Sequence, residues 1–371
     1  MTKNENIKTL LIIGNGFDIA HGMKTRYTDF LDFIKNDVGI SIELPKKILI
    51  TDDLKEIQKI INESISQNRL KYEDIMNYIR NFGNIWIEYF IIIREKKQRE
   101  IGEDWIDFEK EIEDVIKKVE MLIQGKEIEY NDLKYILGEY FSYSASVMTY
   151  RLPDKEEVTK YISTLIWDLK ILTLALECYL SSIEEKISHP PIDIIDKLSN
   201  VSAVISYNYT NTWQKIYGSK NKVDIYFIHG QLGKHNLVLG IGETLSDGLE
   251  NTLISCANFK KYFQKIKYRL GNEYLNIINN PLNHYDKNKW YVVIYGHSLD
   301  PTDKESLESL INAVYVSKVI IYYYDENAYN QQIANAIQII GKNKLIEQVH
   351  SGYIEFKETE KNLSEVSSNE D

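Results

Sequence analysis

The chain begins with an apolar run that does not alternate with polar residues. Residues 7–13 read Ile-Lys-Thr-Leu-Leu-Ile-Ile, and Gly14 follows at once. A short apolar run that ends at a glycine is typical of a strand buried on both faces of a parallel sheet. We therefore expect residues 7–13 to form a central strand.

Between about residues 32 and 191 the apolar positions recur at helical spacing. In residues 105–123, for example, apolar side chains lie three or four positions apart, with acids and lysines between them, as in an amphipathic helix. Short runs rich in β-branched and aromatic residues, typical of strands, return only later. They cover residues 201–207, 224–228, 237–241, 290–295 and 318–324.

Helical patterns follow several of these later strands. One begins after the sequence GHSLD, where Thr302 and Glu305 have the spacing of a capping box. Another covers residues 328–340 and ends at Gly341. Strands that alternate with helices favour a sheet of parallel strands.

The patterns together predict an α/β fold, with a Rossmann-like, doubly wound and mainly parallel sheet and a large helical insertion after the first βα unit. Residues 7–13 should lie beside the strands near 201–207 and 290–295. Three parts are expected along the chain: a nucleotide-binding α/β domain of residues 1–31 and 192–357, a helical insertion domain of residues 32–191, and an acidic, disordered tail of residues 358–371.

Composition narrows the class of protein. The 371 residues carry a formal net charge of -11, which argues against a nucleic-acid-binding domain, because such domains neutralise phosphates with Lys and Arg. No apolar run reaches the roughly 18 to 20 residues that a membrane-spanning helix needs, so we expect a cytoplasmic protein without membrane contacts. The two cysteines, Cys178 and Cys256, are too few for a disulfide framework or a four-cysteine zinc site.

The first candidate site is the turn Gly14-Asn15-Gly16-Phe17-Asp18. A glycine turn after a buried first strand lets the backbone approach a pyrophosphate, either through its lack of a side chain or through a positive φ. The third glycine of the usual fingerprint is missing, so a purely structural turn with Asp18 as a cap or first-turn acid is the alternative. Because a carboxylate repels phosphate, Asp18 is expected to face a ribose hydroxyl or backbone amides.

Further candidates follow three of the later strands, where the carboxyl ends of parallel strands meet a ligand. Asn208 stands in Tyr207-Asn208-Tyr209-Thr210, well placed to bind a substrate or hold water, although a turn asparagine is the plainer interpretation. His229 follows an apolar strand and titrates in the range that suits a general base, although a single histidine is more often structural.

The segment after residues 290–295 repeats this pattern. Gly296, His297 and Ser298 follow the strand, and Asp300 stands before a proline that opens a helix. A helix start at such a strand end suits the sugar or phosphate of a nucleotide.

Five motifs in this order resemble the AbiH family of bacterial abortive-infection proteins. They are LIIGNGFDIAHGMKTRYTDFL, WIDFE, SYNYTNTW, IHGQLG and YGHSLD, and they span roughly residues 10 to 303. The first is the most specific of the five. The resemblance implies a role in defence against bacteriophages.

AbiH proteins are in turn similar to the sirtuin-like NAD-hydrolysing domains of phage defence. The resemblance implies that Gly14 and Gly16 hold the dinucleotide, that Asn208 and His229 act at the nicotinamide ribose, and that Gly296 with Ser298 contacts the adenosine side. The chain departs from these relatives in two places: the loop reads GNGFD instead of Gly-Ala-Gly-x-Ser, and Thr210 stands where they usually have Asp. With two cysteines the zinc module of sirtuin deacylases cannot be built.

The resemblance therefore predicts an anti-phage enzyme that cleaves the N-glycosidic bond of NAD, with Asn208 and His229 as catalytic residues. NAD is the expected substrate, and no cofactor or metal is required. Two alternatives remain: a nucleotide sensor that signals to a partner, and a metal-dependent nuclease or phosphohydrolase that uses Asp18 and Glu109. A homo-oligomer and a phage-derived trigger are both compatible with the sequence.

Overall fold

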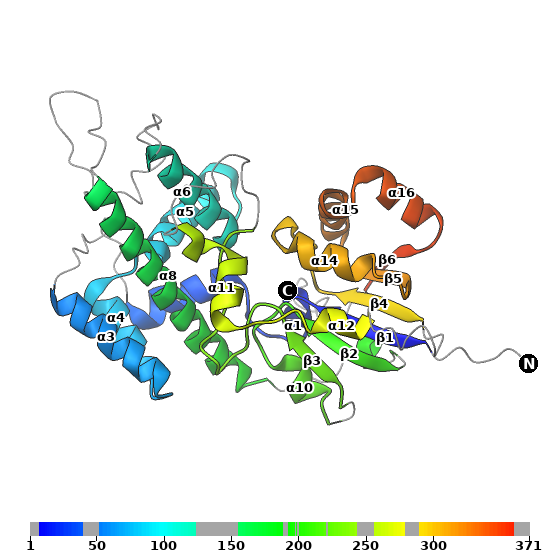
Figure 1. Cartoon of the computed structure of the whole chain (residues 1–371), viewed down its shortest axis with the longest axis horizontal. Helices are drawn as coiled ribbons and strands as arrows, with labels where there is room; N and C mark the ends of the chain where they lie inside the picture. The colour runs from blue at the N-terminus through cyan, green and yellow to red at the C-terminus, as the bar shows by residue number, and fades with distance from the viewer. Residues whose placement is uncertain are drawn as a thin grey trace, which may run out of the picture. The chain divides into compact units, whose positions relative to one another are not determined.

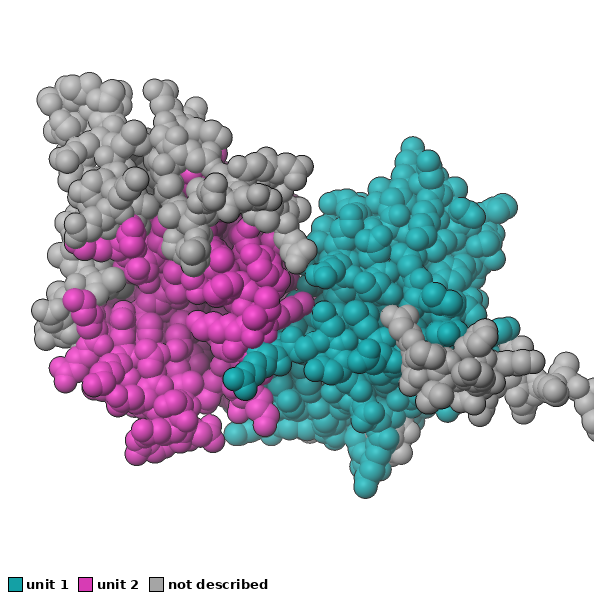
Figure 2. Space-filling view, viewed as in Figure 1, with its two compact units in different colours: residues 1–23, 184–231, 269–371 teal, residues 24–183, 232–268 magenta. Residues whose placement is uncertain are grey.

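The computed structural model describes residues 7–39, 52–123, 155–187, 192–196, 198, 200–219, 222–242, 256–278 and 289–359. The chain divides into two compact units, which Figure 2 shows in different colours. Unit 1 comprises residues 1–23, 184–231 and 269–371, and unit 2 comprises residues 24–183 and 232–268. The expected insertion, residues 32–191, falls almost wholly within unit 2, which also includes residues 232–268.

Unit 1 is built on a sheet of six parallel strands among the described residues (Figure 1). The strand order is β3-β2-β1-β4-β5-β6, the order of doubly wound dinucleotide-binding sheets. The first strand pairs with β2 and β4, as predicted, with Ile12 opposite Ile205 and Ile294. The strands are β1 (Lys8–Ile13), β2 (Val201–Ser206), β3 (Asp224–Phe227), β4 (Trp290–Tyr295), β5 (Val316–Tyr323) and β6 (Ile354–Glu358).

Both faces of the sheet are buried, which explains why the first strand is apolar without alternation. Leu10 and Ile12 belong to one core cluster, and Leu11 and Ile13 to another on the opposite face. The first cluster includes side chains of α12 (Tyr274–Ile278), α14 (Lys304–Ile311), α15 (Glu326–Ile340) and α16 (Lys342–His350). The second includes side chains of α1 (Asn15–Ala20), α9 (Asp193–Asp196) and α10 (Thr212–Ile216).

The strand order reverses between β1 and β4, and the helices change faces at the same place. The helices that follow β1 and β2 cover one face, whereas those that follow β4 and β5 cover the other. The carboxyl ends of β1 and β4 therefore mark the topological switch point, where sheets of this kind bind ligands.

Unit 2 is helical, as the spacing of apolar residues predicts. Its aromatic core includes Phe30, Trp86 and Phe90, with Phe90 stacked on Phe108 at a centroid distance of 4.0 Å. Its helices are α2 (Tyr27–Phe33), η1 (Ile34–Val38), α3 (Asp52–Ser66), α4 (Tyr72–Phe82), α5 (Ile85–Ile101), α6 (Phe108–Ile123), most of α8 (Lys155–Glu184), η3 (Cys256–Phe259) and α11 (Lys261–Tyr268).

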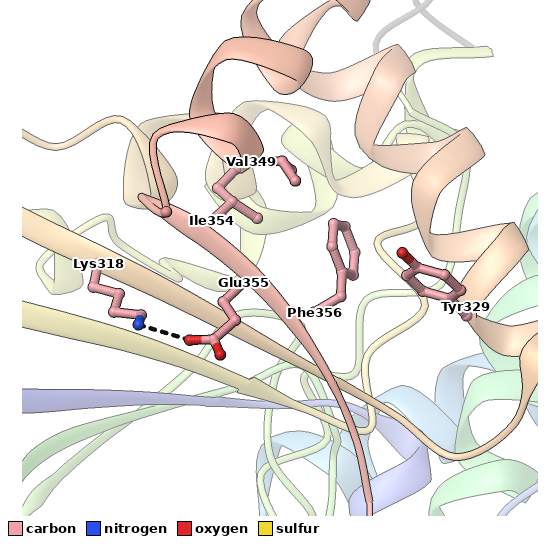
Figure 3. A pocket seen from close by; sticks show the side chains of 7 residues that line it. Lys318, Tyr329, Val349, Ile354, Glu355 and Phe356 are labelled. Atoms are coloured by element: carbon pink, nitrogen blue, oxygen red, sulfur yellow. Dashed lines mark ion pairs between the residues drawn. The ribbon is translucent and has the colours of Figure 1, made fainter.

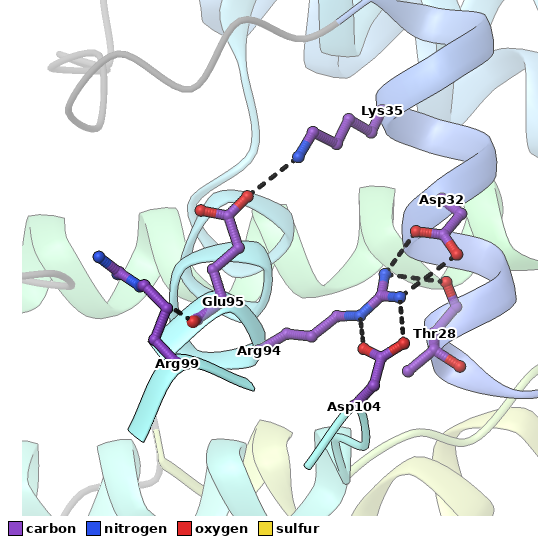
Figure 4. Close-up of polar contacts among 7 residues, drawn as sticks. All are labelled: Thr28, Asp32, Lys35, Arg94, Glu95, Arg99 and Asp104. Carbon is purple, nitrogen blue, oxygen red and sulfur yellow. Dashed lines mark hydrogen bonds and ion pairs between the residues drawn. The ribbon is translucent and has the colours of Figure 1, made fainter. Parts of the chain in front are cut away.

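One arginine joins three segments of unit 2 (Figure 4). The Arg94 guanidinium on α5 donates to both carboxylate oxygens of Asp104, at 2.6 and 3.0 Å, and to both of Asp32 on α2. It also donates to the carbonyl of Thr28. Bidentate pairs of this kind fix geometry, so Arg94 ties α2 to α5 and to the segment that leads into α6.

The predicted strand at residues 237–241 is wrong. In unit 2 this segment forms only an isolated bridge from Ile241 to Lys260. The backbone of Leu239 is satisfied instead by a side chain: Gln264 accepts from its N–H at 3.0 Å and donates to its carbonyl at 2.9 Å. A carboxamide thus takes the place that a neighbouring strand would have.

Other helix and strand ends differ from the predictions. The helix expected from residue 105 begins at Phe108, because the Asp107 carboxylate accepts from the N–H groups of Glu109 and Lys110. The expected Thr302–Glu305 capping box is absent: Asp300 caps the preceding turn by accepting from Thr302. The edge strand β6 was not predicted, and of the expected tail, residues 360–371 lie outside the described residues.

Candidate functional site

The glycine turn after β1 lies against the loop after β4. Gly16 donates from its N–H to the carbonyl of Gly296 at 2.7 Å. A Cβ at Gly14 would lie 2.7 Å from that carbonyl oxygen, and one at Gly16 would lie 2.7 Å from the Gly296 Cα. A positive φ does not explain these glycines, since Gly14 has φ -126° and Gly16 is not in that region, whereas Gly296 has φ +68°. The turn needs glycine because two backbones meet there.

Asp18 is a buried carboxyl group in the first turn of α1. Its Oδ2 accepts from the Thr210 hydroxyl at 2.6 Å, and its Oδ1 is buried without a hydrogen-bond partner. Burial raises the pKa of Asp18 to about 6, although hydrogen bonds from Thr210, Thr212 and Asn208 act in the opposite direction. Near neutral pH this group can therefore gain or lose a proton within the site.

Asn208 joins the ends of β1 and β2. Its side chain is almost fully buried, and Nδ2 donates to the carbonyl oxygen of Gly14 at 2.8 Å. Its backbone is fixed too, because Ser206 Oγ donates to its carbonyl and accepts from its N–H. The Nδ2 group therefore has a structural role, although its bond reaches the end of β1 and is not the local bond of a turn asparagine.

His229 is paired with a carboxylate that sequence reasoning missed. Its Nε2 lies 2.9 Å from Oδ1 of Asp303, and Nε2 of His297 lies 3.6 Å from Oδ2 of the same residue. The Tyr207 ring contacts both imidazoles edge-on, with centroid distances of 5.5 and 4.3 Å, and its hydroxyl bonds to Ser306 Oγ at 2.6 Å. Asp303 and Ser306 stand in the helix start after GHSLD, where an acid and a serine resemble ordinary first-turn residues.

The loop after β4 is held in one conformation from several sides. His297 Nδ1 accepts from the N–H of Leu299 at 2.9 Å. Leu299 has φ +59°, which is rare for a residue with a branched side chain. Amides of α15 complete the loop: Gln332 donates to the carbonyl of His297, and Asn335 donates to that of Ser298.

The predicted site residues therefore form two groups in unit 1. Gly14, Gly16, Asp18, Asn208 and Thr210 surround the ends of β1 and β2, whereas Tyr207, His229 and His297 gather around Asp303. Asn208 and His229 belong to different groups, but they follow the neighbouring strands β2 and β3. Four other predicted residues have different settings: Phe17 is a core side chain, Asn15 and Ser298 are exposed, and Asp300 is a cap.

The acids considered for a metal site and the two thiols have the following settings in the described part of the chain. No group of three or more His, Cys, Asp and Glu residues there is arranged to hold a metal ion. Glu109 lies in unit 2, where it pairs with Lys261 at 2.7 Å, and Asp18 lies in unit 1. Burial raises the pKa of both thiols, Cys178 and Cys256, to about 12. The described helices include none that is long and apolar enough to cross a bilayer.

A pocket in unit 1 lies away from these residues, at the β6 edge of the sheet (Figure 3). Lys318 and Glu355 form an ion pair at 2.6 Å beside it. Its lining consists of Lys318, Tyr329, Val349, Gly352, Ile354, Glu355 and Phe356. It contains no residue that the sequence singled out.

The sequence that forms most of these elements matches a known family. A family model described as bacteriophage abortive infection AbiH matches residues 10–325, from β1 to the residue that caps α15. The chain belongs to the AbiH family. AbiH membership implies an anti-phage role through abortive infection. Among curated proteins and solved structures, none matches this AbiH chain significantly.

Proposed function

We propose that this AbiH protein hydrolyses the N-glycosidic bond of NAD, releasing nicotinamide and so depriving an infected cell of the cofactor. One observation carries the proposal: Asn208 and His229, the latter 2.9 Å from Asp303, follow the adjacent strands β2 and β3 on the β1 side of the switch point, in a sheet with the dinucleotide-binding order. Such a place suits a nucleotide, and a histidine held by a carboxylate is a common general base.

The reaction needs little help with its leaving group. The bond between ribose C1′ and the pyridinium nitrogen breaks with both electrons going to nitrogen, so nicotinamide leaves as a neutral molecule. A water oxygen then bonds to C1′, and His229 accepts the proton that the water loses, which gives ADP-ribose. The protein must mainly stabilise the oxocarbenium charge and exclude other water, and both His229 and Asn208 are buried.

Asn208 and Asp18 would act on the ribose side. Because Nδ2 of Asn208 donates to Gly14, we assign its side-chain oxygen to the substrate. Thr210 stands where sirtuin-like relatives usually have Asp, but its hydroxyl donates to the Asp18 carboxylate at 2.6 Å. We propose that Asp18, reaching from α1, supplies the negative charge that the residue at position 210 lacks.

A second candidate is a nucleotide sensor that signals to a partner without chemistry. The close contact of Gly14 and Gly16 with the loop at Gly296 leaves little room for a pyrophosphate against this turn, a restriction that applies to both candidates, whereas the sensor needs no catalytic base. As a sensor, the protein would use the same residues to recognise a nucleotide and would signal its binding to a partner.

Incubation of the purified full chain with NAD, followed by chromatography of the products, distinguishes the hydrolase from the sensor. The hydrolase produces nicotinamide and ADP-ribose in equal amounts, and His229→Ala, checked for folding by circular dichroism, produces neither. If the protein binds NAD in calorimetry but releases no nicotinamide, with or without extract of infected cells, the sensor is the better account.

A further inference from the structure

We propose that this chain forms a dimer in which the edge strand β6 pairs antiparallel with β6 of a second copy, about a two-fold axis at Phe356. A two-fold interface brings the same surface of each copy together, and this one joins the two sheets into one. Three features of unit 1 carry the inference: an open strand edge, charges that complement themselves across it, and an exposed apolar helix face beside it. The inference does not depend on NAD hydrolysis.

The outer edge of β6 has backbone groups directed away from the sheet. Tyr353 accepts a hydrogen bond from β5 and Thr359 donates one to it, both at 2.7 Å. Because alternate residues of a strand bond to opposite neighbours, the backbone groups of Ile354, Phe356 and Glu358 point outward. No described residue forms a backbone hydrogen bond to them. Such an edge is a template for pairing with another strand.

The side chains of β6 lie on two sides of the strand (Figure 3). Phe356 packs against the core cluster that lies under α14, α15 and α16. Glu355 is on the opposite side, where Lys318 lies 2.6 Å from its Oε2 and Lys357 lies 3.4 Å from its Oε1. Both Glu355 and Lys357 remain partly exposed, so each can face a charge on a second strand.

The charges on β6 are complementary in one register. In an antiparallel pair centred on Phe356, Glu355 lies opposite Lys357 of the second copy, and Lys357 lies opposite its Glu355. A centre one residue earlier sets Glu355 against Glu355, and a centre one residue later sets Lys357 against Lys357. Opposite charges across a strand pair stabilise it and like charges destabilise it. At the favoured centre the two Phe356 residues, whose backbone groups point outward, exchange both of their hydrogen bonds.

The helix beside this edge exposes apolar side chains. α16 contacts β6 and α15 and is the last helix of its layer (Figure 1). Its Leu345 belongs to the core, whereas Ile346 and Val349, three positions apart and so on one face, are 59% and 44% exposed. Val349 lines the same pocket as Phe356. Because α16 lies over β6, pairing of the two β6 strands brings these apolar faces together and removes them from water.

Analytical ultracentrifugation of the full chain over a wide concentration range tests the proposal. The wild type should show a monomer–dimer equilibrium. Lys357→Glu and Glu355→Lys each set like charges opposite one another in a homodimer, and each should weaken association at least about tenfold. Mixed in equal amounts, the two variants should associate again, because one carries two acids at these positions and the other two lysines. Lys222→Glu, at an exposed position before β3, is the matched control and should leave the dimer unchanged.

A wild type that remains a monomer throughout the range would overturn the proposal. A dimer that persists in both charge variants would do the same, and so would a mixture of the two that does not associate. Circular dichroism checks the folding of each protein, since Glu355→Lys also removes the ion pair with Lys318. If that variant does not fold, Lys357→Glu and Ile346→Glu decide, because both change exposed side chains and both should weaken the dimer. A dimer that neither of them weakens would refute the β6 interface.

Discussion

Asn208 donates a hydrogen bond from Nδ2 to the carbonyl oxygen of Gly14 at 2.8 Å, which joins two loops 194 residues apart in the chain. The bond closes the end of β1 against the end of β2. A side chain expected to act on substrate therefore also holds the glycine turn in place. Because of this double role, loss of activity on its own cannot identify what Asn208 does.

Asn208→Ala should lower the free energy of unfolding by about 0.5 to 1.5 kcal/mol, because it removes one of the two hydrogen bonds that the Gly14 carbonyl accepts, the other coming from the Phe17 N–H. Asn330→Ala, at an exposed position on α15, is the matched control and should change stability little. Urea denaturation measures both. Equal stability of the two variants would show that the hydrogen bond contributes little.

Gly16→Val should destabilise the protein by about 3 kcal/mol or more, since its Cβ would overlap the Gly296 backbone. Gly352→Ala provides the comparison, because this glycine has φ +76° but open space around its Cβ position. It should cost only about 1 to 2 kcal/mol, the strain of the left-handed conformation. Similar losses for the two variants in thermal or urea unfolding would mean that the turn can adjust.

Asp18 should make stability fall as pH rises. Its pKa is raised from 3.8 to about 6 in the folded protein, so the folded state retains a proton that the unfolded state has lost. The stability that protonated Asp18 contributes is fully present below about pH 4 and is lost as the pH rises through about pH 6. Its size is on the order of 3 kcal/mol. Relative to Asp18→Asn, which keeps an acceptor for Thr210, the wild type should lose stability across this window. Parallel pH curves for the two proteins would contradict the raised pKa.

The fold was largely predictable because burial restricts which residues a strand or helix can contain. A strand covered on both faces, such as β1, must be apolar throughout, and the helices of unit 2 must repeat their apolar residues at helical spacing. Residues 237–241 carried the same apolar signal, but their hydrogen bonds go to Gln264. No local pattern reveals that a distant carboxamide replaces a strand.

The site was predictable only in part, for a similar reason. Residues at strand ends, such as Asn208 and His229, can be found because parallel strands align their carboxyl ends. Asp303 could not, since its relation to His229 depends on how the loop after β4 bends, and that loop contains a left-handed Leu299. The close backbone approach expected at Gly14 and Gly16 is present, but the backbone that approaches them is that of Gly296.

His229→Ala and Asn208→Ala should each reduce nicotinamide release at least a hundredfold, on the order of a lost general base. If both act on one transition state, the double variant should be hardly slower than either single variant. Initial rates at saturating NAD, with folding checked for each protein, provide the measurement. Fully multiplicative losses would indicate that the two residues act independently.

NAD and nicotinamide in phage-infected cells test the central claim most directly. Cells that express the wild type should lose NAD and accumulate nicotinamide after infection, before lysis, whereas cells with His229→Ala at equal protein level should keep their NAD and lose protection. Wild-type protein that protects the culture while cellular NAD and nicotinamide stay unchanged would contradict the hydrolase account.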